Sequence, residues 1–190
     1  MEAALGLLLS KMLRSASFRI HPHQGKTDLL KKLPSKLRGY ASWLPETWRI
    51  VVVVDRDDDD CDDLKARLEK MAADAGLKTR STAKQKPWVV VNRFAIEELE
   101  AWYFGDWEAV RAAYPKAPAT IPAKVKYRNP DGIRGGTWEA FERVLQGVGY
   151  FASGLRKIEA ARDVAQHMVP SRNTSPSFRA LRDVLGEMAA

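Results

Sequence analysis

The chain of 190 residues is 45% hydrophobic and 29% charged, which excludes a wholly disordered protein and predicts a packed core. The single cysteine, Cys61, excludes a disulfide framework, and no apolar run is long enough to span a membrane, so a cytoplasmic protein is expected. The net charge of +7 is unevenly placed: residues 1–50 carry +6, residues 51–110 carry −5 and residues 111–190 carry +6. An acidic centre between basic segments is typical of metal-dependent enzymes that act on polyanions, and also of ordinary proteins with an aspartate-rich loop.

Hydrophobic periodicity and turn residues divide the chain into helices and strands. The expected helices are residues 2–13, 27–37, 62–75, 97–104, 137–146, 155–168 and 177–188, and the expected strands are 18–23, 49–55 and 88–92. Loops are expected at 40–48, 78–87 and 115–136. Pro34 is expected to interrupt the second helix, and Ser175 before Pro176 is typical of an N-cap for the last one.

Residues 49–55, Arg-Ile-Val-Val-Val-Val-Asp, are the clearest element of the sequence. A continuous β-branched run of this kind is typical of a strand buried on both faces of a parallel sheet. A helix that ends at Gly76 follows, and residues 88–92 repeat the strand pattern. Strand, helix, strand and helix in this order predict an α/β fold with right-handed crossovers. We therefore expect one α/β domain over residues 1–114, with an irregular and helical part over 115–190 packed on it.

The first acidic cluster directly follows the strand expected at 49–55. Asp55 and Asp57 are two residues apart, so both carboxylates point to one side if the backbone stays extended there. Ligands of open α/β sheets bind at the carboxyl ends of strands, and Mg²⁺ or Mn²⁺ prefers carboxylate oxygens together with water and phosphate. Acidic residues also favour a helix N-terminus, an interpretation that accounts for the aspartates within residues 59–63 but not for Asp55.

A second acidic cluster, Glu97, Glu98 and Glu100, follows the second expected strand. Neighbouring parallel strands end at the same edge of a sheet, so this cluster is expected near the first. Glu97 and Glu100 share a face of a helix, whereas Glu98 and Glu100 share a face of an extended chain, and helix N-terminal acids are the alternative interpretation. The prediction is that Asp55 and Asp57 lie within metal-bridging distance of Glu98 or Glu100, and that these four residues are catalytic.

Basic residues flank the acidic centre in loops and on polar helix faces. Each lysine or arginine that neutralises a phosphate adds affinity for nucleic acid that falls with salt. The residues expected to contact nucleic acid are Lys26, Lys31, Lys32, Lys124, Lys126 and Arg128. Residues 132–137 place three glycines before a helix, which suits either a phosphate at the helix N-terminus or a flexible loop with Thr137 as N-cap.

Together these residues resemble the Toprim-like domains of topoisomerases, primases and overcoming-lysogenization-defect nucleases. More closely, the chain resembles an uncharacterised bacterial family of Toprim-like proteins over nearly its whole length. The matching segments are Val54-Asp55-Arg56-Asp57 with Asp59-Asp60-Cys61 behind it, residues 97–102 and residues 172–178. The resemblance implies a parallel-centred sheet flanked by helices, with a helical C-terminal extension.

Toprim-like domains usually open with a strand ending in a Val-Glu-Gly-type turn, whose glutamate joins the Asp-x-Asp pair. Here Met1 falls at the helix that follows such a strand, so the first strand is expected to be missing or to lie upstream. Glu2 matches the second acidic residue of the opening motif. The expected metal ligands are therefore Asp55, Asp57, Glu2, Glu98 and Glu100.

Two classes of function follow from these patterns. The first is a Mg²⁺-dependent nuclease or other phosphotransfer enzyme, acting on DNA, RNA or a small phosphorylated molecule. The second is a non-catalytic nucleic-acid-binding or regulatory subunit, favoured by the absent first strand. An ATPase partner is implied by the resemblance, because Toprim nucleases of this kind often work with one. A haloacid-dehalogenase-like phosphatase shares the Asp-x-Asp strand end, but the lysine-bearing strand and downstream acidic pair that it needs are not recognisable.

Overall fold

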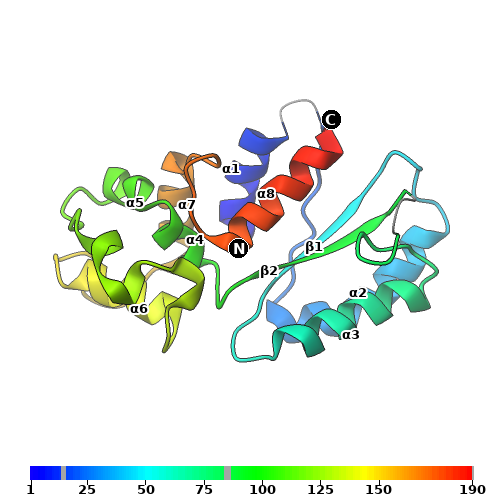
Figure 1. The fold of residues 1–190 in the computed structure, drawn as a ribbon, viewed down its shortest axis with the longest axis horizontal. Coiled ribbons are helices and arrows are strands. Elements are labelled where there is room, and N and C mark those ends of the chain that lie inside the picture. Colours follow the sequence, from blue (N-terminus) through cyan, green and yellow to red (C-terminus); the bar gives the residue numbers. More distant parts are fainter. Residues whose placement is uncertain (14–15, 84–86, 190) are drawn as a thin grey trace. The chain divides into compact units, whose positions relative to one another are not determined.

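A computed structural model describes residues 1–13, 16–83 and 87–189 of the chain (Figure 1). The chain divides into two compact units, which are described one at a time. The sheet unit comprises residues 21–94, and the helical unit comprises residues 1–20 together with 95–190. A parallel sheet and flanking helices are both present, so the expected α/β class is confirmed.

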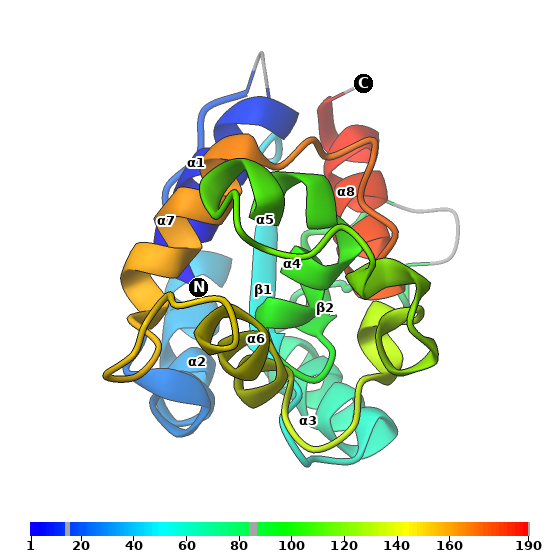
Figure 2. The same ribbon diagram turned by 90° about the vertical axis from the view of Figure 1, so that its left-hand side faces the viewer.

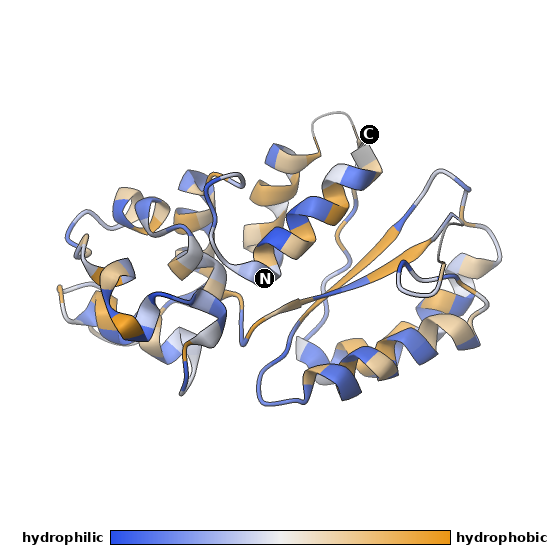
Figure 3. Ribbon diagram, viewed as in Figure 1, coloured by the Kyte–Doolittle hydropathy of each residue, from blue (hydrophilic) through white to orange (hydrophobic). Residues whose placement is uncertain are grey.

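The sheet unit contains two strands and two long helices. These are α2 (Gly25–Ala41), β1 (Ile50–Asp55), α3 (Cys61–Asp74) and β2 (Val90–Ala95), of which β2 runs one residue into the helical unit. The strands β1 and β2 pair side by side and run in the same direction, and α2 packs against α3 (Figure 1). Both strands are hydrophobic over most of their length, whereas polar and apolar residues alternate along the two helices (Figure 3).

The core of the sheet unit lies between the two helices and one face of the sheet. Leucines at helical spacing supply it from α2 and α3, while Val52 and Val54 supply it from alternate positions of β1. Its buried members are Leu30, Leu33, Leu37, Val52, Val54, Leu64, Leu68, Ala72 and Val90. Val51 and Val53, on the other face of β1, are only half-buried, so the strand is less buried than its sequence indicates.

Local capping explains both ends of α3. The Asp60 side chain accepts the backbone N–H groups of the first turn at 2.9 and 3.0 Å, which satisfies donors that have no partner within the helix. At the other end Gly76 adopts a φ of 74°, and the N–H of Leu77 donates to the Ala72 carbonyl over 2.9 Å. The helix expected at 62–75 is thus confirmed to within one residue at each end.

Three expectations about the first half of the chain are wrong. Residues 18–23 form no strand, since Phe18 is exposed and Pro22 lacks the N–H that a ladder needs. Helix α2 is not interrupted at Pro34, because leucines before and after the proline anchor both parts of the helix in the core. The second strand is shifted from 88–92 to the later segment β2.

The helical unit surrounds a second core. Its helices are α1 (Glu2–Met12), α4 (Glu100–Gly105), α5 (Trp107–Ala113), α6 (Thr137–Gln146), α7 (Lys157–His167) and α8 (Pro176–Ala189), with short 3₁₀ turns at Ile121–Ala123, Val125–Tyr127 and Pro130–Gly132. Helix α7 packs against α1 and α5, and α4 packs against α5 and α6 (Figure 2). Helices α1, α4 and α5 thus share one compact unit with the later helices α6, α7 and α8.

Two helices of this unit differ from the sequence interpretation. Helix α4 begins at Glu100, three residues later than expected, and α5 had no expected counterpart. Asp106 ends α4 and caps α5, accepting the N–H of Ala109 over 3.4 Å, so one residue separates two short helices. None of the helices in the described part of the chain combines the length and apolar character that a membrane crossing requires.

Aromatic side chains fill the core of the helical unit. Trp102 and Phe178 meet edge to face with their ring centroids 5.3 Å apart, and Tyr103 meets Phe141 at the same separation. All four side chains are fully buried. The Trp102 indole N–H donates to the Ser177 hydroxyl over 3.0 Å, which satisfies its one polar group. These contacts hold α4, α6 and α8 together.

Candidate functional site

Strand β1 places Asp55 at the carboxyl edge of the sheet, where the chain leaves in a tight turn. Asp55 is the last residue of the strand and is half-buried. The N–H of Asp59 donates to the carbonyl of Arg56 over 3.2 Å and closes the turn. Asp57 lies within it at a φ of 52°, a left-handed conformation that aspartate adopts more readily than most residues. The backbone is therefore not extended here, and strand alternation does not set the directions of the two carboxylates.

The ammonium group of Lys26, at the start of α2, binds this acidic turn. Its Nζ lies 2.8 Å from Asp57 Oδ2 and 2.6 Å from Asp59 Oδ2, and it donates to the Arg56 carbonyl over 2.8 Å. We call these four residues the Lys26 clamp. Burial lowers the pKa of Lys26, but the hydrogen bonds to Asp57 and Asp59 outweigh it, so the pKa lies above its ordinary value. Lys26, expected to contact nucleic acid, here neutralises aspartates of its own chain.

The later aspartates divide between capping and solvent. Asp60 is the N-cap of α3, as the helix-terminus interpretation requires. Asp62 and Asp63 follow in the first helical turn and are exposed, and Asp58 is exposed at the turn itself. The helix-terminus interpretation therefore explains Asp60, Asp62 and Asp63, while Asp55, as the last residue of β1, lies outside it.

In the second acidic cluster, Glu98 caps helix α6. Its Oε2 accepts the Thr137 hydroxyl at 3.1 Å and the N–H of Trp138 at 3.0 Å, both in the first turn of the helix. The N-cap position itself is Gly136, which has a φ of 82° and no side chain to offer, so a carboxylate from another segment takes the place. This helix N-terminus, a candidate phosphate site in the sequence, already holds an anionic group.

The other glutamates differ in burial. Glu100 is 5% exposed in the first turn of α4, Glu97 is half-buried ahead of that helix, and Glu2 is exposed in the first turn of α1. Because α4 begins only at Glu100, Glu97 and Glu100 do not share a face of that helix.

The two acidic clusters belong to different units. Asp55 and Asp57 lie in the sheet unit, whereas Glu2, Glu98 and Glu100 lie in the helical unit. Their meeting within metal-bridging distance stays a prediction. Within the described residues of each unit, no three His, Cys, Asp or Glu side chains gather as a metal-binding group.

Five of the six basic residues expected to contact nucleic acid are exposed. They are Lys31, Lys32, Lys124, Lys126 and Arg128. Lys32 binds Asp28 Oδ1 over 2.7 Å, and this hydrogen bond is the main reason that the pKa of Asp28 falls to about 2. Lys126 lies 5.4 Å from the centre of the Tyr127 ring. The first two residues lie in the sheet unit and the last three in the helical unit, so each unit presents positive charge to solvent.

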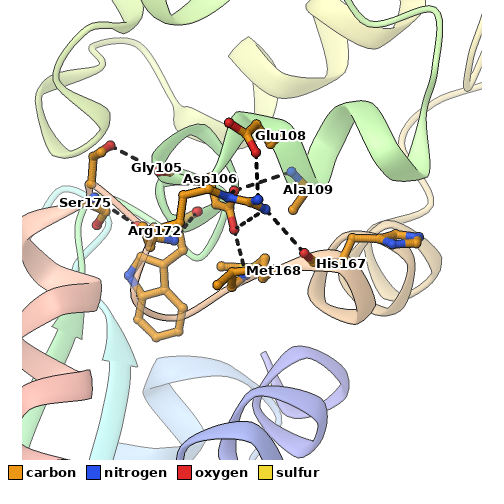
Figure 4. A network of polar contacts seen from close by, with 12 residues as sticks. Gly105, Asp106, Glu108, Ala109, His167, Met168, Arg172 and Ser175 are labelled. Carbon is orange, nitrogen blue, oxygen red and sulfur yellow. Dashed lines mark hydrogen bonds and ion pairs between the residues drawn. The ribbon is translucent and has the colours of Figure 1, made fainter.

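A polar network around one buried carboxylate, which the sequence did not indicate, joins the start of α5 to the segment before α8 (Figure 4). The fully buried Asp106 carboxylate accepts Arg172 Nε at 2.7 Å and Nη2 at 3.2 Å, together with the N–H of Val169 at 2.8 Å. Arg172 Nη1 also binds Glu108 Oε2 at 2.6 Å. The hydrogen bonds to Asp106 raise the pKa of Arg172 above its ordinary value.

The rest of the 172–178 motif is structural as well. Asn173 Nδ2 donates to the Trp102 carbonyl over 2.8 Å. The Ser175 hydroxyl donates to Asp131 Oδ1 over 2.6 Å, and it accepts a first-turn N–H of α8 at 3.2 Å, which confirms Ser175 as the N-cap. The motif that carries part of the family resemblance therefore fastens α4 and the last 3₁₀ turn to α8.

A second missed cluster lies within the sheet unit around Glu69. Its carboxylate accepts hydrogen bonds from the hydroxyls of Thr79 and Ser81 and, over 2.8 Å, from Asn92 Nδ2. Burial raises the pKa of Glu69, but these hydrogen bonds outweigh it and leave the pKa below its ordinary value. Asn92 was the available signal, because a polar residue inside an apolar strand needs a partner.

Comparison with known proteins adds one result to this geometry. The family model of DUF4276, described as a domain of unknown function, matches residues 1–186. The chain belongs to the DUF4276 family. No curated protein and no solved structure matches it. The DUF4276 match spans both units, so the acidic strand end, the Lys26 clamp and the 172–178 motif are all parts of the DUF4276 domain.

Proposed function

We propose that this DUF4276 protein is a Mg²⁺-dependent phosphotransfer enzyme of Toprim type, and specifically a nuclease. The observation that carries the proposal is Asp55, a half-buried carboxylate at the carboxyl end of a parallel strand, where open α/β sheets bind their ligands. Capping and helix-terminus effects account for Asp60, Asp62 and Asp63, and Lys26 binds Asp57 and Asp59, but neither effect requires a carboxylate at the end of β1. The residues that follow β2, the neighbouring strand, include Glu98 and Glu100.

The Lys26 clamp supports a cation site at this strand end. Two carboxylate oxygens and one carbonyl oxygen lie between 2.6 and 2.8 Å from a single positively charged atom. Oxygen ligands of these kinds are the ones that Mg²⁺ and Mn²⁺ take in proteins. A divalent ion would therefore either displace Lys26 from Asp57 or bind beside it through Asp55.

In the proposed reaction, Mg²⁺ would supply polarisation of a phosphodiester and a more acidic water. Asp55 and Asp57 would hold the ion, and Glu98 or Glu100 would complete the site. Lys26 would move from carboxylate to phosphate, because the ammonium group binds either kind of oxygen. The exposed lysines of each unit would hold flanking phosphates and set the position of the strand.

A second candidate function is a non-catalytic nucleic-acid-binding or regulatory partner of an ATPase. The observation that favours it is that both acidic clusters already have structural partners. Lys26 neutralises Asp57 and Asp59, and the N-terminus of α6 takes Glu98. A protein of this kind would bind nucleic acid and leave it intact.

Metal binding by Asp55→Asn is the decisive measurement. We expect calorimetry to show Mn²⁺ binding by the natural protein and at least about tenfold weaker binding by the variant, with no loss of folding, because the change removes one anionic ligand. Asp74→Asn is the matched control, since Asp74 is an exposed aspartate of the same unit that pairs with Lys70. Equal Mn²⁺ affinity in both variants would reject the metal site.

Cleavage directed by bound iron tests whether the two acidic clusters share that ion. Fe²⁺ with ascorbate and peroxide generates radicals that cut the backbone close to the metal. Cuts near both residues 55–59 and residues 97–100 are expected, and both should disappear in Asp55→Asn. Cuts confined to 55–59 would separate Glu98 and Glu100 from the site.

A further inference from the structure

The end of α2 and the loop that follows it carry a row of aromatic side chains, of which Tyr40 is half-buried and Trp43 and Trp48 are exposed. The centroids of the Tyr40 and Trp43 rings are 5.5 Å apart, and those of Trp43 and Trp48 are 6.5 Å apart. His21 extends the row, with its ring 6.2 Å from that of Tyr40. Trp43 is 58% exposed and Trp48 52% exposed, whereas most large apolar side chains of this chain are buried. We call these four residues the aromatic row.

Hydrogen bonds hold the backbone beneath the aromatic row. The N–H of Trp43 donates to the Tyr40 carbonyl over 3.1 Å, and that of Trp48 donates to the Pro45 carbonyl over 2.9 Å. Arg49 Nη1 then donates to the carbonyls of Glu46 and Trp48 at 2.6 and 2.8 Å. The backbone that carries Trp43 and Trp48 is therefore held in a hydrogen-bonded turn.

Neighbouring rings of the aromatic row are inclined to one another, and more than half of Trp43 and of Trp48 is exposed to solvent. Neighbouring planes are inclined by 57° between Tyr40 and Trp43 and by 69° between Trp43 and Trp48, so the rings do not stack on one another. An aromatic face that is not covered by a neighbour can stack with a flat ligand. The exposed Trp43 and Trp48 can offer such faces within one short segment of the chain.

The same segment is positively charged. Residues 34–49 contain Lys36, Arg38 and Arg49 against one acidic residue, Glu46, which gives a net charge of +2. The hydrogen bonds of Arg49 go to backbone carbonyls, which do not neutralise its charge. Arg38 is exposed on α2. Aromatic faces and cations together select a ligand that is both flat and anionic.

We propose that the aromatic row is a stacking surface for unpaired bases of single-stranded nucleic acid, with Arg38 and Arg49 facing the phosphates. Every base has an aromatic face, so this surface would bind single strands with little sequence preference. Bases inside a duplex are already stacked and paired, so duplexes would gain nothing from the row. The inference names the substrate class of the proposed nuclease and in that respect rests on it.

Binding is measured with a fluorescent thymidine oligonucleotide of about 20 nucleotides in EDTA, so that no metal contributes. Loss of two stacking side chains in Trp43→Ala/Trp48→Ala is expected to weaken single-strand binding about 10- to 100-fold. The slope of affinity against salt should stay unchanged, because phosphate contacts remain. Trp43→Phe/Trp48→Phe should keep most of the affinity, since it keeps the aromatic faces.

The control is Ile158→Ala/Val169→Ala, which truncates two exposed apolar residues of the helical unit and should leave binding unchanged. Wild-type affinity in the Trp43→Ala/Trp48→Ala variant would overturn the proposal. So would the absence of oligonucleotide binding by the natural protein, even if a protein partner were found on the aromatic row. Binding through the row without any cleavage in Mn²⁺ would support it and count against the nuclease proposal alone.

Discussion

At the scale of single residues, each acidic cluster is balanced by a positive group of the protein. An ammonium group faces Asp57 and Asp59, and the N-terminus of a helix faces Glu98. These partners bind the carboxylate oxygens through hydrogen bonds or ion pairs. They also compete with any cation that the same oxygens would bind, so the strength of metal binding depends on how easily each partner gives way.

Replacing Lys26 with methionine tests this competition. Lys26→Met keeps most of the apolar stem and removes the charge, so we expect Mn²⁺ affinity to rise severalfold by calorimetry. The free energy of unfolding should fall by about 1 kcal/mol in urea, as for a partly exposed ion pair. Lys31→Met, on the same helix and exposed, is the control and should change neither quantity. Unaltered Mn²⁺ affinity in Lys26→Met would show that the ion does not compete with Lys26.

The pH dependence of the Lys26 clamp has a definite sign. Folding raises the pKa of Lys26, so its contribution to stability is fully present below its ordinary value of 10.5 and is lost as the pH rises through the folded-state value. The stability difference between the natural protein and Lys26→Met should therefore be constant from about pH 7 to about pH 9 and shrink above about pH 10. A difference that grows in alkaline solution would contradict this assignment.

At the scale of elements, local signals made some boundaries predictable and left others hidden. The β-branched run of β1 and the cap and stop residues of α3 are neighbours in sequence, so both elements could be placed from the sequence. Helix α5 depends on Asp106, whose other partners come from the distant segment before α8. The expected break at Pro34 was wrong because the packing of the leucines on either side of it outweighs the local tendency of proline to break a helix.

The candidate site was predictable to a similar extent. Asp55 could be placed at the sheet edge, because an apolar strand that ends in a carboxylate is visible in the sequence. The Lys26 clamp could not, since it depends on α2 packing beside the strand end and on the left-handed turn at Asp57. The cap that Glu98 provides to α6 was hidden for the same reason: its partners lie far along the chain.

The cap on α6 gives a test of the structural role of Glu98. Glu98→Gln keeps an oxygen acceptor but removes the charge at the helix N-terminus, so the free energy of unfolding should fall by about 1 kcal/mol. Asp183→Asn, an exposed surface change, should stay within about 0.5 kcal/mol in the same urea titration. Unchanged stability in Glu98→Gln would mean that the cap contributes nothing.

The close approach of α4 to the 172–178 motif can be tested with two glycine-to-alanine changes that should alter stability in opposite directions. A Cβ at Gly105 would lie 2.2 Å from Asn173 Oδ1 and 2.9 Å from the backbone nitrogen of Ser175. Gly105→Ala should therefore cost about 2–3 kcal/mol, or prevent folding. Gly186→Ala, in the open helix α8, meets no atom within 4 Å and should instead stabilise by up to about 1 kcal/mol. Thermal unfolding of the two variants compares them directly, and equal midpoints would contradict the close packing.

At the scale of the whole molecule, positive charge is exposed on both units, so nucleic-acid binding should depend steeply on salt. About four phosphate contacts to a single strand predict a log–log slope near −3. Lys124→Gln/Lys126→Gln should reduce that slope by about 1.4, because two contacts are lost. Lys70→Gln, whose partner is Asp74, should leave it unchanged. An unchanged slope in the Lys124→Gln/Lys126→Gln variant would exclude that loop from the contact surface.

The order of the two units along the chain bears on how the protein is made. In the sequence, the residues of the helical unit both precede and follow those of the sheet unit. The first helix of the helical unit, α1, packs against α7 and α8. During synthesis the residues of the sheet unit are complete once residue 94 has emerged from the ribosome, whereas α1, with its buried Leu5 and Leu8, meets its main partner helix α7 only after residues 157–167 emerge. Helix α1 thus lacks its main packing partner through most of translation and can bury its apolar side chains fully only after α7 and α8 have been made.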